Sequence, residues 1–192
     1  MRIEIELKAW VTDPEALKRA LTTGASPARF LGNFEKEDTY WYPAPGIAGV
    51  SLPPSGIRIR TETHTDAQGM ASRKVCITYK TKEVREGIEV NDEREFSVSD
   101  VQVFEELLRR LGLEPGIEKH KRGWAWDYAG ITVELAHVTG LGWFVELEIL
   151  ADNDRPETVA SARARLLALL PCLGIGTDKI ETRYYTELLK LP

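Results

Sequence analysis

The chain has few of the residues that build disulfide frameworks or zinc sites. It contains two cysteines, Cys76 and Cys172, and three histidines among 192 residues. The two cysteines lie far apart, and the histidines are scattered, so neither type shows the spacing of a metal site. These scarcities predict a cytoplasmic protein with two incidental reduced thiols, and they argue against zinc.

Long apolar runs and a basic charge balance are also absent. No segment approaches the roughly 20 apolar residues of a membrane span, and no signal peptide is visible, so we expect no membrane partner. The formal net charge of −5 argues against a general nucleic-acid binder, which is usually basic. The length fits one domain, residues 1–192, with a substantial core.

What the chain does have is a first strand with one charged face. Residues two apart share a face of a strand, so Glu4, Glu6 and Lys8 line one side of this strand. The other side is apolar and consists of Ile3, Ile5, Leu7 and Ala9. Neighbouring carboxylates suit a divalent cation, and the lysine suits an anion bound to that cation. The alternative is a solvated outer face of an antiparallel sheet.

The same alternation recurs along the chain, and each charged face is nearly single-signed. Basic faces carry Arg58, Arg60, Lys80 and Lys82. Acidic faces carry Glu89, Glu93, Glu95, Glu134, Glu146 and Glu148. Solvated faces usually mix such residues, whereas a closed barrel turns its charged faces inward. The pattern therefore predicts an α+β fold, an eight-stranded antiparallel β-barrel or tunnel with a charged lumen and helices packed outside. Such a lumen would bind a polyanion together with Mg²⁺ or Mn²⁺.

Turn and capping signals divide the chain into these elements. We predict strands at about 2–11, 28–42, 117–128, 131–138 and 143–150, with further strands flanking the turn 65–69 and following Gly87. A helix capped by Ser99 should bury Phe104, Leu107, Leu108 and Leu111. Further helices are predicted after Thr12, over 156–170 and over 179–189.

An ordered set of motifs resembles the CYTH superfamily, also called triphosphate tunnel metalloenzymes. The match runs through Glu4-x-Glu6-x-Lys8, Asp38-Thr39-Tyr40, Arg58-x-Arg60, Thr78-Tyr79-Lys80, Glu93-x-Glu95, Gly140-Leu141-Gly142-x-Phe144, Glu146-x-Glu148 and Tyr185. The segments 89–96 and 140–149 look most like the class IV adenylyl cyclase branch. The resemblance implies a tunnel enzyme that acts on a triphosphate with a divalent metal.

That resemblance leaves the reaction open. Our first expectation is a class IV-type adenylyl cyclase that converts ATP to cyclic AMP and pyrophosphate. The alternatives are a triphosphatase acting on inorganic triphosphate, thiamine triphosphate or a nucleoside triphosphate, and a non-catalytic triphosphate- or polyphosphate-binding module. Ala136 favours the binding module, because the family often has an acid there. We expect a monomer or a homodimer.

The resemblance also implies roles for individual residues. The expected catalytic residues are Glu4, Glu6, Lys8 and Glu148. The expected metal ligands are Glu4, Glu6, Glu146 and Glu148, with Glu134 as a substitute for the acid missing at Ala136. The expected substrate-binding residues are Lys8, Arg58, Arg60, Lys80, Lys82, Glu93, Glu95 and Tyr185, with Lys121 or Arg122. Glu93 and Glu95 would either contact the metal or orient the basic residues. Tyr185 would either close one mouth of the tunnel or serve only in packing. The strand register of Lys119, Lys121 and Arg122 is ambiguous.

Overall fold

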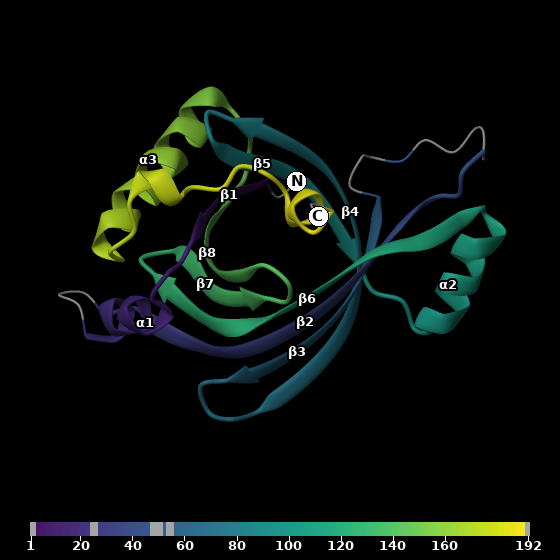
Figure 1. Ribbon diagram of the computed structural model, residues 1–192, viewed down its shortest axis with the longest axis horizontal. Helices are drawn as coiled ribbons and strands as arrows, with labels where there is room; N and C mark the ends of the chain where they lie inside the picture. Colours follow the sequence, from purple (N-terminus) through teal and green to yellow (C-terminus); the bar gives the residue numbers. More distant parts are fainter. Residues whose placement is uncertain (1–2, 24–26, 47–51, 53–55, 191–192) are drawn as a thin grey trace.

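The computed structural model describes residues 3–23, 27–46, 52 and 56–190, and in this part of the chain eight antiparallel strands close into a barrel (Figure 1). The strands are β1 (Ile3–Trp10), β2 (Arg29–Pro43), β3 (Ile57–Asp66), β4 (Ala71–Arg85), β5 (Ile88–Phe96), β6 (Leu113–Tyr128), β7 (Ile131–Val138) and β8 (Gly142–Ala151). Their order around the barrel is β1-β5-β4-β3-β2-β6-β7-β8. The predicted α+β barrel with helices outside is confirmed.

Strand β1 closes the barrel, because it pairs with β5 on one side and with β8 on the other. The β1–β8 register runs from Ile3 opposite Ala151 to Trp10 opposite Phe144. Because the barrel is closed, the described sheet has no strand at a free edge of its strand order. The register also places Glu6 opposite Glu148 on β8 and opposite Glu89 on β5. Three carboxylates from three strands therefore lie at one level of the barrel wall.

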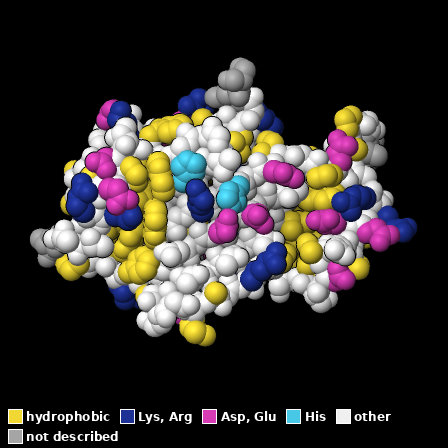
Figure 2. Space-filling model, turned by 60° about the horizontal axis from the view of Figure 1, so that its bottom comes forward, with side chains coloured by type: hydrophobic (Ala, Val, Ile, Leu, Met, Phe, Trp, Pro, Cys, Tyr) yellow, Lys and Arg dark blue, Asp and Glu magenta, His cyan; other side chains and the backbone are white. Residues whose placement is uncertain are grey.

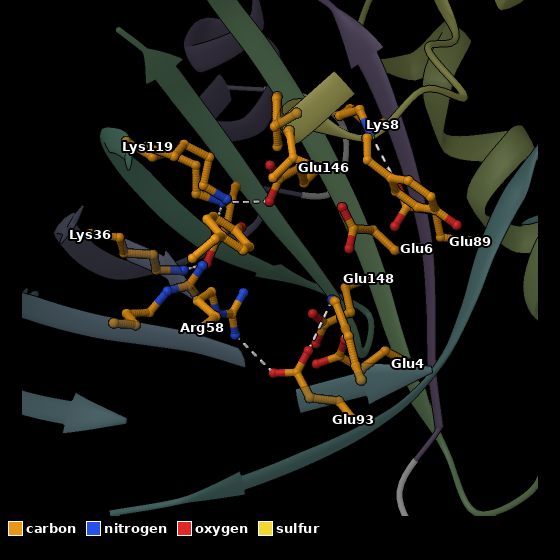
Figure 3. Close-up of a pocket in the computed structure, with 18 of the residues that line it drawn as sticks. Glu4, Glu6, Lys8, Lys36, Arg58, Glu89, Glu93, Lys119, Glu146 and Glu148 are labelled. Carbon is orange, nitrogen blue, oxygen red and sulfur yellow. Dashed lines mark hydrogen bonds and ion pairs between the residues drawn. The ribbon is translucent and has the colours of Figure 1, made fainter. Parts of the chain in front are cut away.

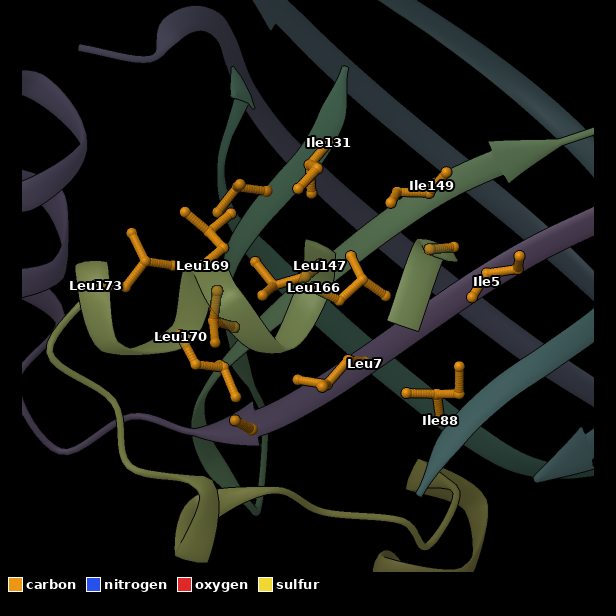
Figure 4. Packing of buried hydrophobic residues seen from close by; sticks show 14 of the residues in the cluster. Ile5, Leu7, Ile88, Ile131, Leu147, Ile149, Leu166, Leu169, Leu170 and Leu173 are labelled. Carbon is orange, nitrogen blue, oxygen red and sulfur yellow. The ribbon is translucent and has the colours of Figure 1, made fainter. Parts of the chain in front are cut away.

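Two helices, α1 (Pro14–Thr23) and α3 (Pro156–Cys172), cover the apolar outer face of β1, β7 and β8. Figure 4 shows Leu166, Leu169 and Leu170 of α3 against Leu7 and Leu147. Full burial of one such leucine contributes about 1.5–3 kcal/mol. The main core therefore lies outside the barrel, between its wall and the helices. In the described residues, no helix is both long and apolar enough to cross a membrane.

Helix α2 (Val101–Arg110) packs on another part of the wall, where Leu108 joins Trp41, Ile59 and Ile77. The predicted buried stripe was too wide. Leu107 and Leu111 are 48% and 55% exposed, because α2 meets the barrel only along the line of Leu108. The predicted cap was one residue early, because the side chain of Asp100 accepts the hydrogen bonds from the first backbone N–H groups of the helix.

The predicted boundaries were wrong in two other places. Strand β6 begins at Leu113 rather than at residue 117, because it continues to pair with the end of β2. The last predicted helix, over 179–189, is instead a 3₁₀ turn (η1, Thr177–Lys179) and the short helix α4 (Tyr185–Leu188). Between them the chain extends along β1, where Ile180 bridges Ala9 and the Glu181 N–H donates to the Lys8 carbonyl at 2.8 Å. Pairing with the barrel thus overrides the helical pattern.

Candidate active site

The lumen of the barrel holds an open cavity with a strongly ionic lining (Figure 3). Seven of the lining residues are lysine or arginine, seven are glutamate, and five are tyrosine or threonine. They are Glu4, Glu6, Lys8, Lys36, Tyr40, Arg58, Arg60, Lys80, Glu89, Glu93, Lys119, Lys121, Thr132, Glu134, Glu146, Glu148, Tyr184, Tyr185 and Thr186. Figure 2, by contrast, shows acidic and basic side chains interspersed on the outer face that it presents.

The strand order sorts these charges into two halves. The consecutive strands β4, β3, β2 and β6 carry six of the seven lining cations, and the consecutive strands β7, β8, β1 and β5 carry all seven glutamates. Lys8 is the lining cation on the acidic half. In Figure 3, Lys36, Arg58 and Lys119 accordingly face Glu146, Glu6 and Glu148 across the lumen. A bound polyanion would therefore meet cations on one side and carboxylates on the other.

Most of the predicted site residues line this cavity. They are Glu4, Glu6, Lys8, Arg58, Arg60, Lys80, Glu93, Lys121, Glu134, Glu146, Glu148 and Tyr185. Arg122 does not, because Lys119 and Lys121 take the inward positions of β6 and leave Arg122 exposed on the outer face. Glu95 is likewise exposed, and its carboxylate lies 4.0 Å from the Lys74 ammonium. The side chain of Lys82 lies outside the described part of the structure.

Sequence reasoning assigned no binding role to three cations or aromatics that line the lumen, namely Lys36, Lys119 and Tyr184. Lys36 lies on β2, where Lys36, Asp38 and Tyr40 alternate with outward residues. That alternation was a usable signal. It was hidden because β2 mixes both charge signs on its inner face.

One buried ionic cluster joins the two halves through lysine. The Lys36 ammonium lies 2.6 Å from Glu134, and Lys121 lies 2.8 Å from the other oxygen of Glu134 and also contacts Glu146. Burial would raise the pKa values of both glutamates, but Lys121 outweighs it, so the pKa of Glu146 falls to about 2 and that of Glu134 is also lowered. These two predicted metal ligands are therefore already neutralised by lysines.

A second cluster lies around Glu93. Its carboxylate accepts from Arg58 at 3.1 Å and lies 2.9 Å from the Lys80 ammonium, which is also 3.4 Å from Glu4. Burial opposes the shift, but Lys80 and Arg58 lower the pKa of Glu93 to about 2. Of the two alternatives for Glu93, this geometry matches the one in which it orients basic residues.

Glu6 and Glu148 differ from these neutralised acids. Burial, with added repulsion from Glu89 and Glu146, raises the pKa of Glu6 to about 8. Burial, with repulsion from Glu4 and Glu134, raises the pKa of Glu148 to about 7. Burial is the largest cause of both raised pKa values, and the further rise caused by neighbouring glutamates marks a local excess of negative charge around these two acids.

That excess charge is the observation by which the lumen fits a divalent cation. Glu4, Glu6 and Glu148 supply the hard oxygen ligands that Mg²⁺ and Mn²⁺ prefer. No three acidic, histidine or cysteine side chains in the described residues form a ready-made metal cluster. Mg²⁺ does not need one, since it usually keeps several waters and binds one or two carboxylates together with substrate phosphates.

The excess charge also predicts a pH effect on stability. The folded state keeps a proton on Glu6 that the unfolded chain releases near its ordinary pKa of 4.5, so stability is lost as pH rises from about 4.5 to about 8. Without divalent metal, Glu6→Gln should therefore raise the free energy of unfolding at pH 8 by about 1–3 kcal/mol and change it little at pH 4. Urea unfolding across this pH range measures the effect. The exposed control Glu118→Gln should keep the wild-type slope, and an equal slope in both variants would contradict the assignment.

Tyr185 lies at the end of the lumen that the C-terminal segment approaches. It is 8% exposed, its ring packs edge-on against Phe144 at 5.0 Å, and the ammonium groups of Lys8 and Lys119 lie 4.8 and 5.1 Å from the ring centre. Tyr185 thus both packs and lines the cavity.

Comparisons with known proteins agree with this geometry. The chain is 25% identical to "Adenylate cyclase CyaB" of Aeromonas hydrophila, over 97% of this chain and 88% of that protein. It resembles the structure of the PH1012 protein of Pyrococcus horikoshii, with a TM-score of 0.72, 27% identity and coverage of 96% of this chain and 98% of that one. A putative adenylate cyclase of Vibrio parahaemolyticus shares the fold, with a TM-score of 0.74, 19% identity and coverage of 98% of each chain. The CYTH domain matches residues 2–185, so the chain belongs to the CYTH domain family, as its motifs predicted.

Proposed function

We propose that the protein is a metal-dependent enzyme acting on a triphosphate substrate, and that it converts ATP to cyclic AMP and pyrophosphate. The observation that carries this proposal is the division of the lumen into a basic half and an acidic half. A triphosphate needs cations along its whole length, and arginine and lysine supply them. The similarity to a protein named adenylate cyclase favours ATP.

The residues divide the work by charge. Arg58, Arg60 and Lys119 bind phosphate oxygens and hold the chain of phosphates in line for attack. Glu4, Glu6 and Glu148 would hold Mg²⁺ or Mn²⁺, which supplies charge neutralisation for the phosphates and the leaving group. In the cyclase reaction, the ribose 3′-oxygen bonds to the α-phosphorus and loses its proton. The bond from that phosphorus to the bridging oxygen breaks, and pyrophosphate leaves.

The lining of the cavity favours a triphosphatase as the second candidate. Besides ionisable lysine, arginine and glutamate, the described lining offers only tyrosine and threonine, with no amide side chain to read a base edge. A site of this kind suits inorganic triphosphate, or the triphosphate end of a thiamine or nucleoside compound. Water then attacks the terminal phosphorus, the bond from that phosphorus to the bridging oxygen breaks, the shortened phosphate chain leaves, and orthophosphate is the second product.

A product assay tests these candidates. Pure protein is incubated with ATP, and separately with inorganic triphosphate, in Mg²⁺ and in Mn²⁺, and the products are separated. We expect cyclic AMP and pyrophosphate from ATP. Orthophosphate without cyclic AMP would replace the cyclase with the triphosphatase. Thermal stabilisation by triphosphate without any product would identify a binding module, for which the buried apolar Ala136 is the structural argument.

A further inference from the structure

We infer that Asp38 is a positioning residue of the lumen, whose carboxylate holds Arg60 and Lys119 side by side as one phosphate-binding unit. This inference rests on the proposed function, because it takes a triphosphate as the ligand of these two cations. It assigns a task to an acid that lies within the basic half of the barrel and that the proposed reaction does not otherwise use.

The strand order places Asp38 between its two partners. Strand β2 lies between β3 and β6, and the registers set Asp38 opposite Arg60 on one side and opposite Lys119 on the other. Its carboxylate accepts from Arg60 Nε at 2.6 Å and from Arg60 Nη2 at 2.9 Å. The Lys119 ammonium lies 3.0 Å from Asp38 Oδ2. One carboxylate thus joins three adjacent strands.

Asp38 and its two partners differ in their access to the cavity. The Asp38 side chain is fully buried, with 0% exposure, and it does not line the cavity. Arg60 and Lys119 do line it, with side chains 13% and 5% exposed. Asp38 therefore acts on a ligand only through the two cations.

The hydrogen-bond count shows that the cations keep the capacity to bind. A guanidinium has five N–H donors and an ammonium has three. Asp38 takes two donors from Arg60 and one from Lys119, which leaves three and two for phosphate oxygens. A guanidinium held by two parallel hydrogen bonds has a fixed plane, so its remaining donors have fixed directions.

Charge explains why an acid is needed at this point. Two buried cations on neighbouring positions repel each other, and burial disfavours their charged forms. Burial would raise the pKa of Asp38, but Lys119 and Arg60 hold it well below its usual range, so this acid stays ionised at every working pH. Without it, the two cations would move apart and lose their common orientation.

The test has two parts with the Asp38→Asn variant, namely the binding of inorganic triphosphate with Mg²⁺, measured by calorimetry, and the turnover of ATP with Mg²⁺, measured by steady-state kinetics. We expect Kd and KM to rise by at least tenfold while kcat changes less than threefold. The matched control is Asp127→Asn, which removes a carboxylate that lies 2.7 Å from Arg29, is 33% exposed and does not line the cavity, and which should leave KM unchanged. In a background of Arg60→Ala and Lys119→Ala, adding Asp38→Asn should have no further effect on Kd.

A second variant covers the case in which Asp38→Asn does not fold. Asp38→Glu keeps the charge but lengthens the side chain, so a role in charge balance alone would give the wild-type KM, whereas a positioning role still raises KM several-fold. Wild-type KM in a folded Asp38→Asn or Asp38→Glu variant, with Arg60→Ala impaired, would overturn this inference alone. Failure of the wild-type protein to bind triphosphate would overturn the proposed function, and the inference with it.

Discussion

Glu148→Gln should reduce metal-dependent turnover by roughly 100- to 1,000-fold while the barrel remains folded. Glu148 lies in the acidic half, lines the cavity, and has no ion-pair partner in the described residues. The substitution keeps the size of the side chain and removes a negative charge that the lumen balances poorly. The loss should therefore appear in activity and in metal affinity rather than in stability.

The measurement compares product formation with the Mn²⁺-dependent rise in melting temperature in the presence of triphosphate. The control is Glu118→Gln, the same chemical change at an exposed position on the outer face of β6. We expect the control to match the wild-type protein in both assays. A fully active Glu148→Gln variant would contradict the assignment of Glu148 as a metal ligand. It would also contradict the proposed role of the acidic half in holding the metal.

The fold was predictable because the period of two along each strand is a strong physical signal. Charged residues that alternate with Ile3, Ile5 and Leu7 cannot all be buried in an apolar core, and their sorting by sign indicated a lumen. The C-terminal region was less predictable. Its helical pattern gave no sign that Ile180 would pair with Ala9 instead, since a contact between residues so far apart is not a local property of the sequence.

The candidate site was predictable where a strand carried one sign of charge. Most of the predicted acids and bases do line the cavity. Strand β6 could not be resolved, because five consecutive residues, 118–122, are charged or histidine, and both of its registers put a cation inward. The pairing of β6 with β2 decides the register, and it turns Lys121 inward and Arg122 outward.

The sequence also could not show which acids of the lumen are neutralised by lysines and which are not. Glu134, Glu146 and Glu148 look alike along their strands, yet the structure gives them different charge environments. Lys36 and Lys121 neutralise Glu134 and Glu146, while Glu148 keeps a raised pKa. The difference depends on which lysine reaches across the barrel from β2 and β6, and this follows from strand order and register.

Lys121→Met should lower the free energy of unfolding at pH 7 by about 3–5 kcal/mol, because it leaves buried carboxylates without their cation. The Lys121 side chain is 4% exposed and contacts both Glu134 and Glu146. Glu134 keeps Lys36, but Glu146 loses its ion pair, and its other oxygen is already buried without a hydrogen-bond partner. For a chain of this size the melting temperature should fall by about 6–20 °C.

The pH dependence distinguishes this electrostatic cause from lost packing. In the wild-type protein the lowered pKa of Glu146 gives stability that is present above the ordinary value of 4.5 and is lost as pH falls toward about 2. Lys121→Met removes that contribution, so its deficit should be largest at neutral pH and should shrink in acid. Adding Glu146→Gln should restore part of the stability at pH 7.

The control variant is Lys74→Met, which removes a lysine that is 57% exposed and should lower the free energy of unfolding by less than about 1 kcal/mol. A deficit in Lys121→Met that stays constant with pH would assign the loss to packing, and the lysine would then not be the counter-ion that keeps these two acids charged.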